Sequence, residues 1–333
     1  MLKKGLCLFS GLLSLTLSSC SRGNITVSDY ILKLDYSKDY RILQLTDTHL
    51  GDKDNLEEHF KFMDLTIKES NPDLIVVTGD LFTFASRTTA KRFFKFLDSY
   101  GAKWTVVFGN HDEQCYFSVD WVTNLLNNYG SNCVYKDIQD DAIQGNGNFA
   151  INLMKGEGIF EQLILMDSNR YYFGDYFGYD CFKEEQIEWY SNLIDYTTKQ
   201  NGGTIVPSLM FYHIPLPEIN DAYDKAKAGD ASAHFVYEGQ KNENACPPDH
   251  DYHFFDTIVK KGSTTGMYFG HDHINDFIVN YTVDGRSIDF GYGIKATDRI
   301  YYKEDMMGGR TIVLKDDHSV SYVNHYHTYE EVK

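Results

Sequence analysis

Five apolar segments of this sequence end in side chains that bind metals or carry protons, and no other feature constrains the fold as strongly. Each segment is short and continuous, as in a buried strand, and the polar residues follow it directly. In open α/β sheets, ligands bind at the carboxyl ends of the strands. If the five strands belong to one sheet system, their terminal side chains meet along one edge. These side chains are Asp47 and His49, then Asp80, then Asn110, His111 and Asp112, then His213, and finally His271 and His273.

Any one of these endings has an ordinary structural explanation. An Asp-x-His pair such as Asp47 and His49 is common in turns, "TGD" is typical of a tight turn, and a strand-end residue such as His213 is usually hydrogen-bonded. The segment "GNHD" is more informative, because Asn-His-Asp after a buried strand has little structural purpose. Five such endings in order favour one shared site over five separate turns.

Strand-like and helix-like segments alternate along the first part of the chain, which predicts a parallel sheet covered by helices. We expect strands at 40–45, 73–77, 103–108, 148–154, 162–168, 205–213 and 265–270, and helices at 55–70, 88–101 and 183–199. The C-terminal part alternates around "DG" and "DDHS" turns, which is typical of hairpins. No linker interrupts the pattern, so we expect a single domain over residues 39–330.

The order D-x-H, G-D, G-N-H-D, H, G-H-x-H resembles that of the calcineurin-like metallophosphoesterase superfamily over roughly residues 40 to 300. The resemblance implies a four-layer α/β/β/α sandwich of two mixed sheets flanked by helices, with a metal site at the carboxyl-terminal rim of the strands. "FYHIPLPE" and "FGHDHINDF" are similar to the purple-acid-phosphatase-like branch. In that branch a tyrosine follows the bridging aspartate by three residues. Thr83 stands there in this chain, so a purple iron(III) centre is not implied.

The donor types predict the kind of metal. Carboxylates, imidazoles and one amide, with no thiolate, suit divalent Mn, Fe or Zn. The donors are numerous enough for two ions, which can clamp a phosphoryl group and ionise a shared water. The resemblance implies in-line attack on phosphorus by a hydroxide that bridges two divalent metal ions. It assigns Asp47, His49 and His273 to one ion, assigns Asn110, His213 and His271 to the other, and makes Asp80 the bridge.

The remaining motif residues are expected to serve catalysis. The resemblance places His111 off the ligand list and facing the substrate, where it can donate a proton to the leaving oxygen or neutralise phosphoryl charge. The adjacent Asp112 is expected to orient His111. The alternative is that His111 only caps a turn.

A hydrolase of phosphomonoesters or phosphodiesters is the function that these motifs favour. One alternative is a non-catalytic metal-binding surface or scaffolding lipoprotein on the same fold, and another is a tethered protein that uses metal only for stability. The complete motif set favours the hydrolase, because non-catalytic relatives tend to lose ligands or the His111-type residue. Substrate contacts are expected mainly in 113–147, 169–182 and 218–250, where no pattern identifies a substrate.

The N-terminal residues predict export and lipid attachment. A basic "MLKK" precedes an apolar stretch that is too short to span a membrane and ends in "LSSC", which resembles a bacterial lipobox. We therefore expect a lipoprotein signal peptide over 1–19, lipid attachment at Cys20, and a flexible tether over 20–38. The expected location is the bacterial cell envelope, on the outer face of a membrane. An ordinary secretory signal is the alternative.

Charge and cysteines limit the possible partners. The formal net charge of −17 makes nucleic acid or anionic lipid a poor electrostatic partner. The expected partners are a phosphate-ester substrate and a membrane reached through the lipid. Disulfides persist outside the cytoplasm. The cysteines available for them are Cys115, Cys133, Cys181 and Cys246, whose pairing the sequence leaves open.

Overall fold

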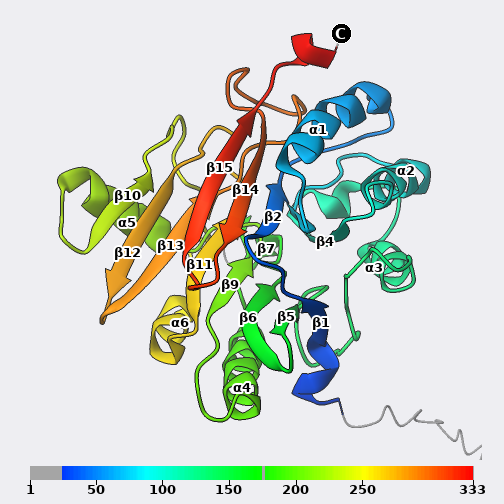
Figure 1. Ribbon diagram of the computed structural model, residues 1–333. Helices are drawn as coiled ribbons and strands as arrows, with labels where there is room; N and C mark the ends of the chain where they lie inside the picture. Colours follow the sequence, from blue (N-terminus) through cyan, green and yellow to red (C-terminus); the bar gives the residue numbers. More distant parts are fainter. Residues whose placement is uncertain (1–24, 175–176, 333) are drawn as a thin grey trace, which may run out of the picture.

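The computed structural model describes residues 25–174 and 177–332, and in it two β-sheets are stacked between two groups of helices (Figure 1). The predicted four-layer α/β architecture is therefore confirmed. The predicted signal peptide and Cys20 lie outside the described residues. No helix within the described part of the chain is long and apolar enough to cross a membrane.

The smaller sheet has five strands in the order β15-β14-β2-β3-β4. Its strands are β2 (Tyr40–Leu45), β3 (Leu74–Thr78), β4 (Lys103–Val107), β14 (Gly308–Leu314) and β15 (Val320–Tyr326). β2, β3 and β4 are parallel because α1 (Leu56–Ser70) and α2 (Arg87–Asp98) carry the chain back between them. β14 and β15 form the predicted hairpin, and α3 (Val119–Asn127) follows β4.

The larger sheet has eight strands in the order β1-β5-β6-β9-β11-β13-β12-β10. Its strands are β1 (Ile31–Asp35), β5 (Phe149–Lys155), β6 (Gly158–Leu165), β9 (Ser208–Phe211), β10 (Ala233–Tyr237), β11 (Thr264–Phe269), β12 (Ile278–Val283) and β13 (Arg286–Tyr292). The helices on its outer side are α4 (Glu184–Gln200), α5 (Glu218–Ala228) and α6 (Phe254–Lys261). Because β6, β9 and β11 are parallel, their carboxyl ends share one edge of the sheet.

Short elements complete the fold. A separate hairpin is formed by β7 (Tyr171–Phe173) and β8 (Phe177–Tyr179), and the 3-10 helices are η1 (Val27–Tyr30), η2 (Asp112–Gln114) and η3 (Tyr329–Val332).

The core lies on both faces of the larger sheet. Leu163 and Leu165 of β6 pack in the cluster between the two sheets, whereas Ile164 packs in the cluster beneath α4, α5 and α6. This division follows from the alternation of side chains along a strand. A strand that is buried on both faces gives the continuous apolar runs seen in the sequence.

The expected tether differs from the structure, because residues 27–35 belong to the folded domain. β1 pairs in parallel with β5, Leu32 and Leu34 pack against the core between the sheets, and the Tyr30 hydroxyl donates to Asp140 at 2.8 Å. Leu32, Leu34 and Tyr36 alternate with Lys33 and Asp35, which is a strand pattern that the interpretation as a polar linker missed. The four cysteines in the described residues are free, so no disulfide forms among them: Cys115, Cys133, Cys181 and Cys246.

Candidate metal centre

The predicted metal ligands meet at the rim where the carboxyl ends of both sheets converge. Two groups of buried donors lie there, and within each group the donor atoms are within 4.8 Å of one another. The first group is Asp47, His49, Asp80 and His273, and the second is Asp80, His213 and His271. Asp80 belongs to both groups, which matches the bridging position expected from the sequence.

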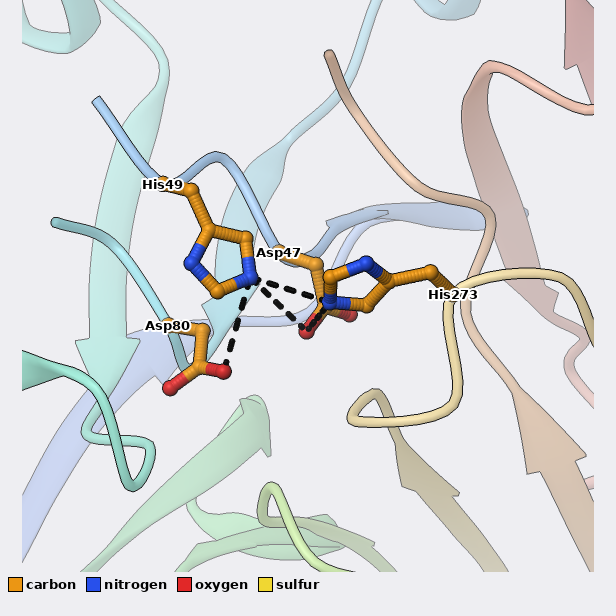
Figure 2. A group of neighbouring side chains, drawn as sticks. All are labelled: Asp47, His49, Asp80 and His273. Carbon is orange, nitrogen blue, oxygen red and sulfur yellow. Dashed lines mark hydrogen bonds and ion pairs between the residues drawn. The ribbon is translucent and has the colours of Figure 1, made fainter. Parts of the chain in front are cut away.

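His49 and His273 face each other across the first group (Figure 2). Their Nε2 atoms are 2.9 Å apart, and the Nδ1–H of His273 donates to the carbonyl of Tyr301 at 2.9 Å. A carbonyl only accepts, so a neutral His273 presents the lone pair of Nε2 to the centre. Two imidazoles held this way fit a shared cation.

His213 is oriented in the same manner in the second group. Its Nδ1–H donates to the carbonyl of Thr78 at 2.8 Å, and Nε2 lies 3.2 Å from Oδ2 of Asp80 without a hydrogen-bond partner. Burial alone would lower the pKa of His213, but Asp80 outweighs it and raises the pKa to about 10. Burial would raise the pKa of Asp80, yet His213 and His49 hold it well below its usual range. Asp80 and His213 thus each favour the charged form of the other.

Asn110 also fits the role of a metal donor. Its Nδ2–H donates to the hydroxyl of Tyr171 at 2.9 Å, while its Oδ1 is buried without a hydrogen-bond partner. A buried amide oxygen without a partner is costly. A cation at this position would satisfy it together with Nε2 of His213, so the residues present fit a metal pair of the expected hard-to-borderline type.

Four of the predicted ligands have the left-handed backbone conformation, with φ of 54° at Asp47, 44° at His49, 49° at Asp80 and 80° at His271. Non-glycine residues rarely adopt it, at a cost of about 1–3 kcal/mol each, and such strain gathers at functional sites. The folded core therefore holds these four residues in a conformation that places the ligands, although the residues themselves disfavour it.

The motif glycines are required by close approach between motifs. A Cβ at Gly109 would lie 2.3 Å from Oδ1 of Asp80, and one at Gly79 would lie 2.4 Å from Nδ1 of His213. Gly79 also has a φ of +86°. Any larger residue at either position would displace a ligand that comes from a distant part of the sequence.

His111 lies beside the donor groups without joining them. Its ring is partly exposed and its centroid is 5.0 Å from that of His49. Its backbone N–H donates to Oδ1 of Asp80 at 2.8 Å, and its Nδ1 contacts Oε1 of Gln114 at 2.8 Å. His111 is thus outside both donor groups, as expected for a residue that is not a metal ligand.

The role expected for Asp112 is wrong. Its two oxygens accept the backbone N–H groups of Phe82 (3.0 Å) and Gly109 (2.8 Å), and the carboxyl is buried. Asp112 therefore fixes the loops that carry Asp80 and Asn110, whereas Gln114 is the residue in contact with the His111 ring. The adjacency of Asp112 to His111 in sequence gave no information about which way the carboxyl points.

The structure adds supporting residues that the motif order did not indicate. Lys295 is buried and its Nζ donates to the backbone carbonyl of Asp47 at 2.8 Å. Burial lowers the pKa of Lys295 to about 8. On the β7–β8 hairpin, Tyr171 contacts Asn110, and the ring of Tyr179 lies 4.3 Å from that of His271. Tyr171 and Tyr179 thus lie over the second group.

Thr83 supports a ligand from the position where the purple branch has a tyrosine. Its Oγ1 lies 2.9 Å from Nδ1 of His49 and thereby fixes the orientation of that ring. We expect Thr83→Val to weaken metal binding about 10–100-fold, because such supporting hydrogen bonds orient the ligand. Calorimetric titration of metal-depleted protein with Mn²⁺ measures this. Thr83→Ser keeps the hydroxyl and should bind as the unmodified protein does; equal affinity for the valine variant would contradict this role of Thr83.

The model of the calcineurin-like phosphoesterase family matches residues 40–275, which is more than half of the chain. The chain belongs to the calcineurin-like phosphoesterases. The match spans the segments that supply both donor groups, so family and geometry agree. A dimetal phosphatase from Danio rerio has a similar fold, with a TM-score of 0.51, 14% identity and coverage of 88% of this chain and 100% of that one.

Two curated proteins with similar sequences have names that differ in whether they describe an active phosphatase. One is called "Probable inactive purple acid phosphatase 29" from Arabidopsis thaliana, 27% identical over 305 residues, which cover 81% of this chain and 76% of that protein. The other is "Phosphatase DCR2" from Saccharomyces cerevisiae, 25% identical over 282 residues, which cover 76% of this chain and 47% of that protein. The first relative is therefore named as a probable inactive purple acid phosphatase, whereas the second is named as a phosphatase.

Proposed function

We propose that this protein hydrolyses phosphate esters with two divalent metal ions held by the candidate metal centre. The observation that carries the proposal is the position of Asp80. Its Oδ2 lies 3.5 Å from Nε2 of His49 and 3.2 Å from Nε2 of His213, so one carboxylate oxygen faces both donor groups. A purely structural metal site has no need for two donor groups that share a carboxylate.

Bound metal ions would polarise the phosphoryl oxygens and lower the pKa of a water molecule. The chain itself supplies the positioning. The groups around Asp47, Asp80 and His213 are buried and already oriented by their hydrogen bonds, so little reorganisation is required when charge develops. His111 is the partly exposed imidazole at the edge of this arrangement and acts as a general acid, donating a proton to the leaving oxygen.

A panel of phosphomonoesters and phosphodiesters tests the proposal. We expect the metal-depleted protein to be inactive and Mn²⁺, Fe²⁺ or Zn²⁺ to restore turnover of at least one ester class. A protein that binds metal tightly but turns over no ester would instead support the non-catalytic surface or scaffolding function, to which the name of the Arabidopsis relative also points. Stabilisation by metal without turnover would support a purely structural role.

We further propose that the protein is exported and held on the outer face of a bacterial membrane by lipid at Cys20. The support is the order of a basic start, a short apolar run, small residues and a cysteine. A chain with a net charge of −17 has little electrostatic attraction to anionic lipid, so the lipid would be the main anchor.

Cell fractionation of a Cys20→Ser variant tests this anchor. The unmodified protein should remain with membranes after a high-salt wash, whereas the variant should be released to the soluble fraction. The wash removes material that is held only by surface charge. Identical partitioning of the two proteins would show that lipid at Cys20 does not hold the protein.

A further inference from the structure

A pocket of about 430 Å³ opens beside the metal centre. Four separate parts of the chain line it: the loop after β2, the loop after β3, the segment after η2 and the loop after β13. Thr83 belongs to its wall, and the same Thr83 hydroxyl contacts Nδ1 of His49 at 2.9 Å. A group bound here would therefore lie next to the first donor group, so one substrate molecule could occupy both the pocket and the metal centre.

Three large apolar side chains surround this pocket and remain exposed. The exposed fraction is 59% for Phe84, 69% for Tyr116 and 51% for Ile300. Single exposed apolar residues are normal, but three around one pocket at the rim of a catalytic centre mark a binding surface for an apolar group.

The backbone holds two of these side chains in unfavourable conformations. Phe84 has a φ of 53° and Ile300 has a φ of 69°. A left-handed conformation is uncommon for any bulky residue and is an outlier for a β-branched one. Strain of this kind persists where function selects the position of a side chain. Glycine would be the residue expected at both positions if only the turn mattered.

The charged side chains of the pocket are two cations, Lys53 and Arg299, and two carboxylates, Asp52 and Asp54. Nε of Arg299 pairs with Oδ2 of Asp54 at 2.8 Å, and Asp54 is itself fixed by the Gly51 N–H at 2.7 Å. Lys53 lines the same pocket and forms no ion pair with any residue in the described parts of the chain. The formal charges of the pocket therefore cancel, and its preference for an apolar group comes from its apolar walls.

We propose that this pocket binds a ring-sized apolar group attached to the phosphate of the substrate. The assignment rests on the proposed phosphoesterase function and narrows it to esters with a bulky apolar or aromatic organic part. The phosphoryl group faces the donor groups, and the ring lies between Phe84, Tyr116 and Ile300. An ester whose organic part is only a small alkyl group does not cover these side chains. They stay exposed to water, so the ester binds more weakly.

Binding of two phosphonates to the metal-loaded, full-length protein tests the pocket without requiring turnover. Benzylphosphonate and methylphosphonate have no ester bond, and they differ by a phenyl ring. We expect benzylphosphonate to bind about tenfold or more tightly by calorimetry, because the ring leaves water. Phe84→Gly and Ile300→Gly should bring the ratio of the two Kd values close to one, with the Kd of methylphosphonate unchanged.

The glycine variants also control for misfolding. Because glycine adopts the left-handed conformation without strain, their Tm values should not fall below that of the unmodified protein. Phe173→Ala is the matched control, since Phe173 is also an exposed phenylalanine but lies on the β7–β8 hairpin. Loss of the preference in this control alone would place the ring against the hairpin and overturn the assignment.

The outcomes separate this proposal from the phosphoesterase function. Equal affinity for the two phosphonates, or no binding of either, overturns the pocket even if esters are hydrolysed. A preference for benzylphosphonate that both glycine variants abolish supports the pocket. If that preference occurs in a protein that hydrolyses no ester, the pocket stands and the phosphoesterase function fails.

Discussion

Asp80→Asn should lose most of its bound metal at both positions and nearly all phosphoesterase turnover. The carboxylate Oδ2 faces His49 and His213 from the two donor groups, and its negative charge offsets the repulsion between two cations. We expect affinity for Mn²⁺ to fall by more than about 100-fold, since even a lost supporting hydrogen bond costs 10–100-fold. Calorimetric titration of metal-depleted protein gives both affinity and stoichiometry.

Asp272→Asn is the matched control for that variant. Asp272 is a buried aspartate between His271 and His273, but its Oδ2 accepts the Tyr292 hydroxyl at 2.5 Å and does not belong to either donor group. This variant should still bind two equivalents. If Asp80→Asn bound two equivalents as tightly as the unmodified protein, the shared role of Asp80 would be wrong.

His111→Ala should keep both metals and lose turnover by about 10²–10⁴-fold, the usual contribution of a positioned proton donor. The ring lies at the edge of the centre and no donor group includes it. Metal content and kcat are measured on the same preparation. Loss of metal together with loss of fold would show that His111 has a structural role.

The chemistry of the leaving group gives a sharper readout for His111. An ester of an alkyl alcohol needs a proton on its leaving oxygen, whereas a nitrophenyl ester needs it much less. The alanine variant should therefore lose more activity toward the alkyl ester. Gln114→Ala, which removes the contact to Nδ1 of His111, should show the same selectivity with a smaller loss. Equal losses on both esters would argue against proton donation.

The layered fold and the convergence of the ligands were predictable because they follow from patterns along the chain. Asp47, Asp80 and Asn110 each come directly after a continuous apolar run, and parallel strands bring their carboxyl ends to one edge. His213 and His271 join them through β9 and β11 of the other sheet. In each case, the polar residues that follow the apolar segments were enough to predict which side chains meet at the metal centre.

Contacts between distant segments were not predictable in the same way. Three such contacts depend on how loops fold over the metal centre. They are the contact between Thr83 and His49, the hydrogen bond from Lys295 to Asp47, and the hydrogen bond between Asn110 and Tyr171. Nothing in the local pattern encodes these approaches. The substrate pocket is a similar case, because only Tyr116 among its apolar wall residues lies within the loops that were expected to set specificity.

The most direct test of the proposal that two metal ions are needed is a titration of Mn²⁺ into the metal-depleted protein. Turnover of a phosphate ester is recorded at each addition. Two donor groups that share Asp80 predict that turnover rises until two equivalents per chain are bound and then stays constant. Full turnover at a single equivalent, or turnover that is unaffected by removal of the metal, would contradict it.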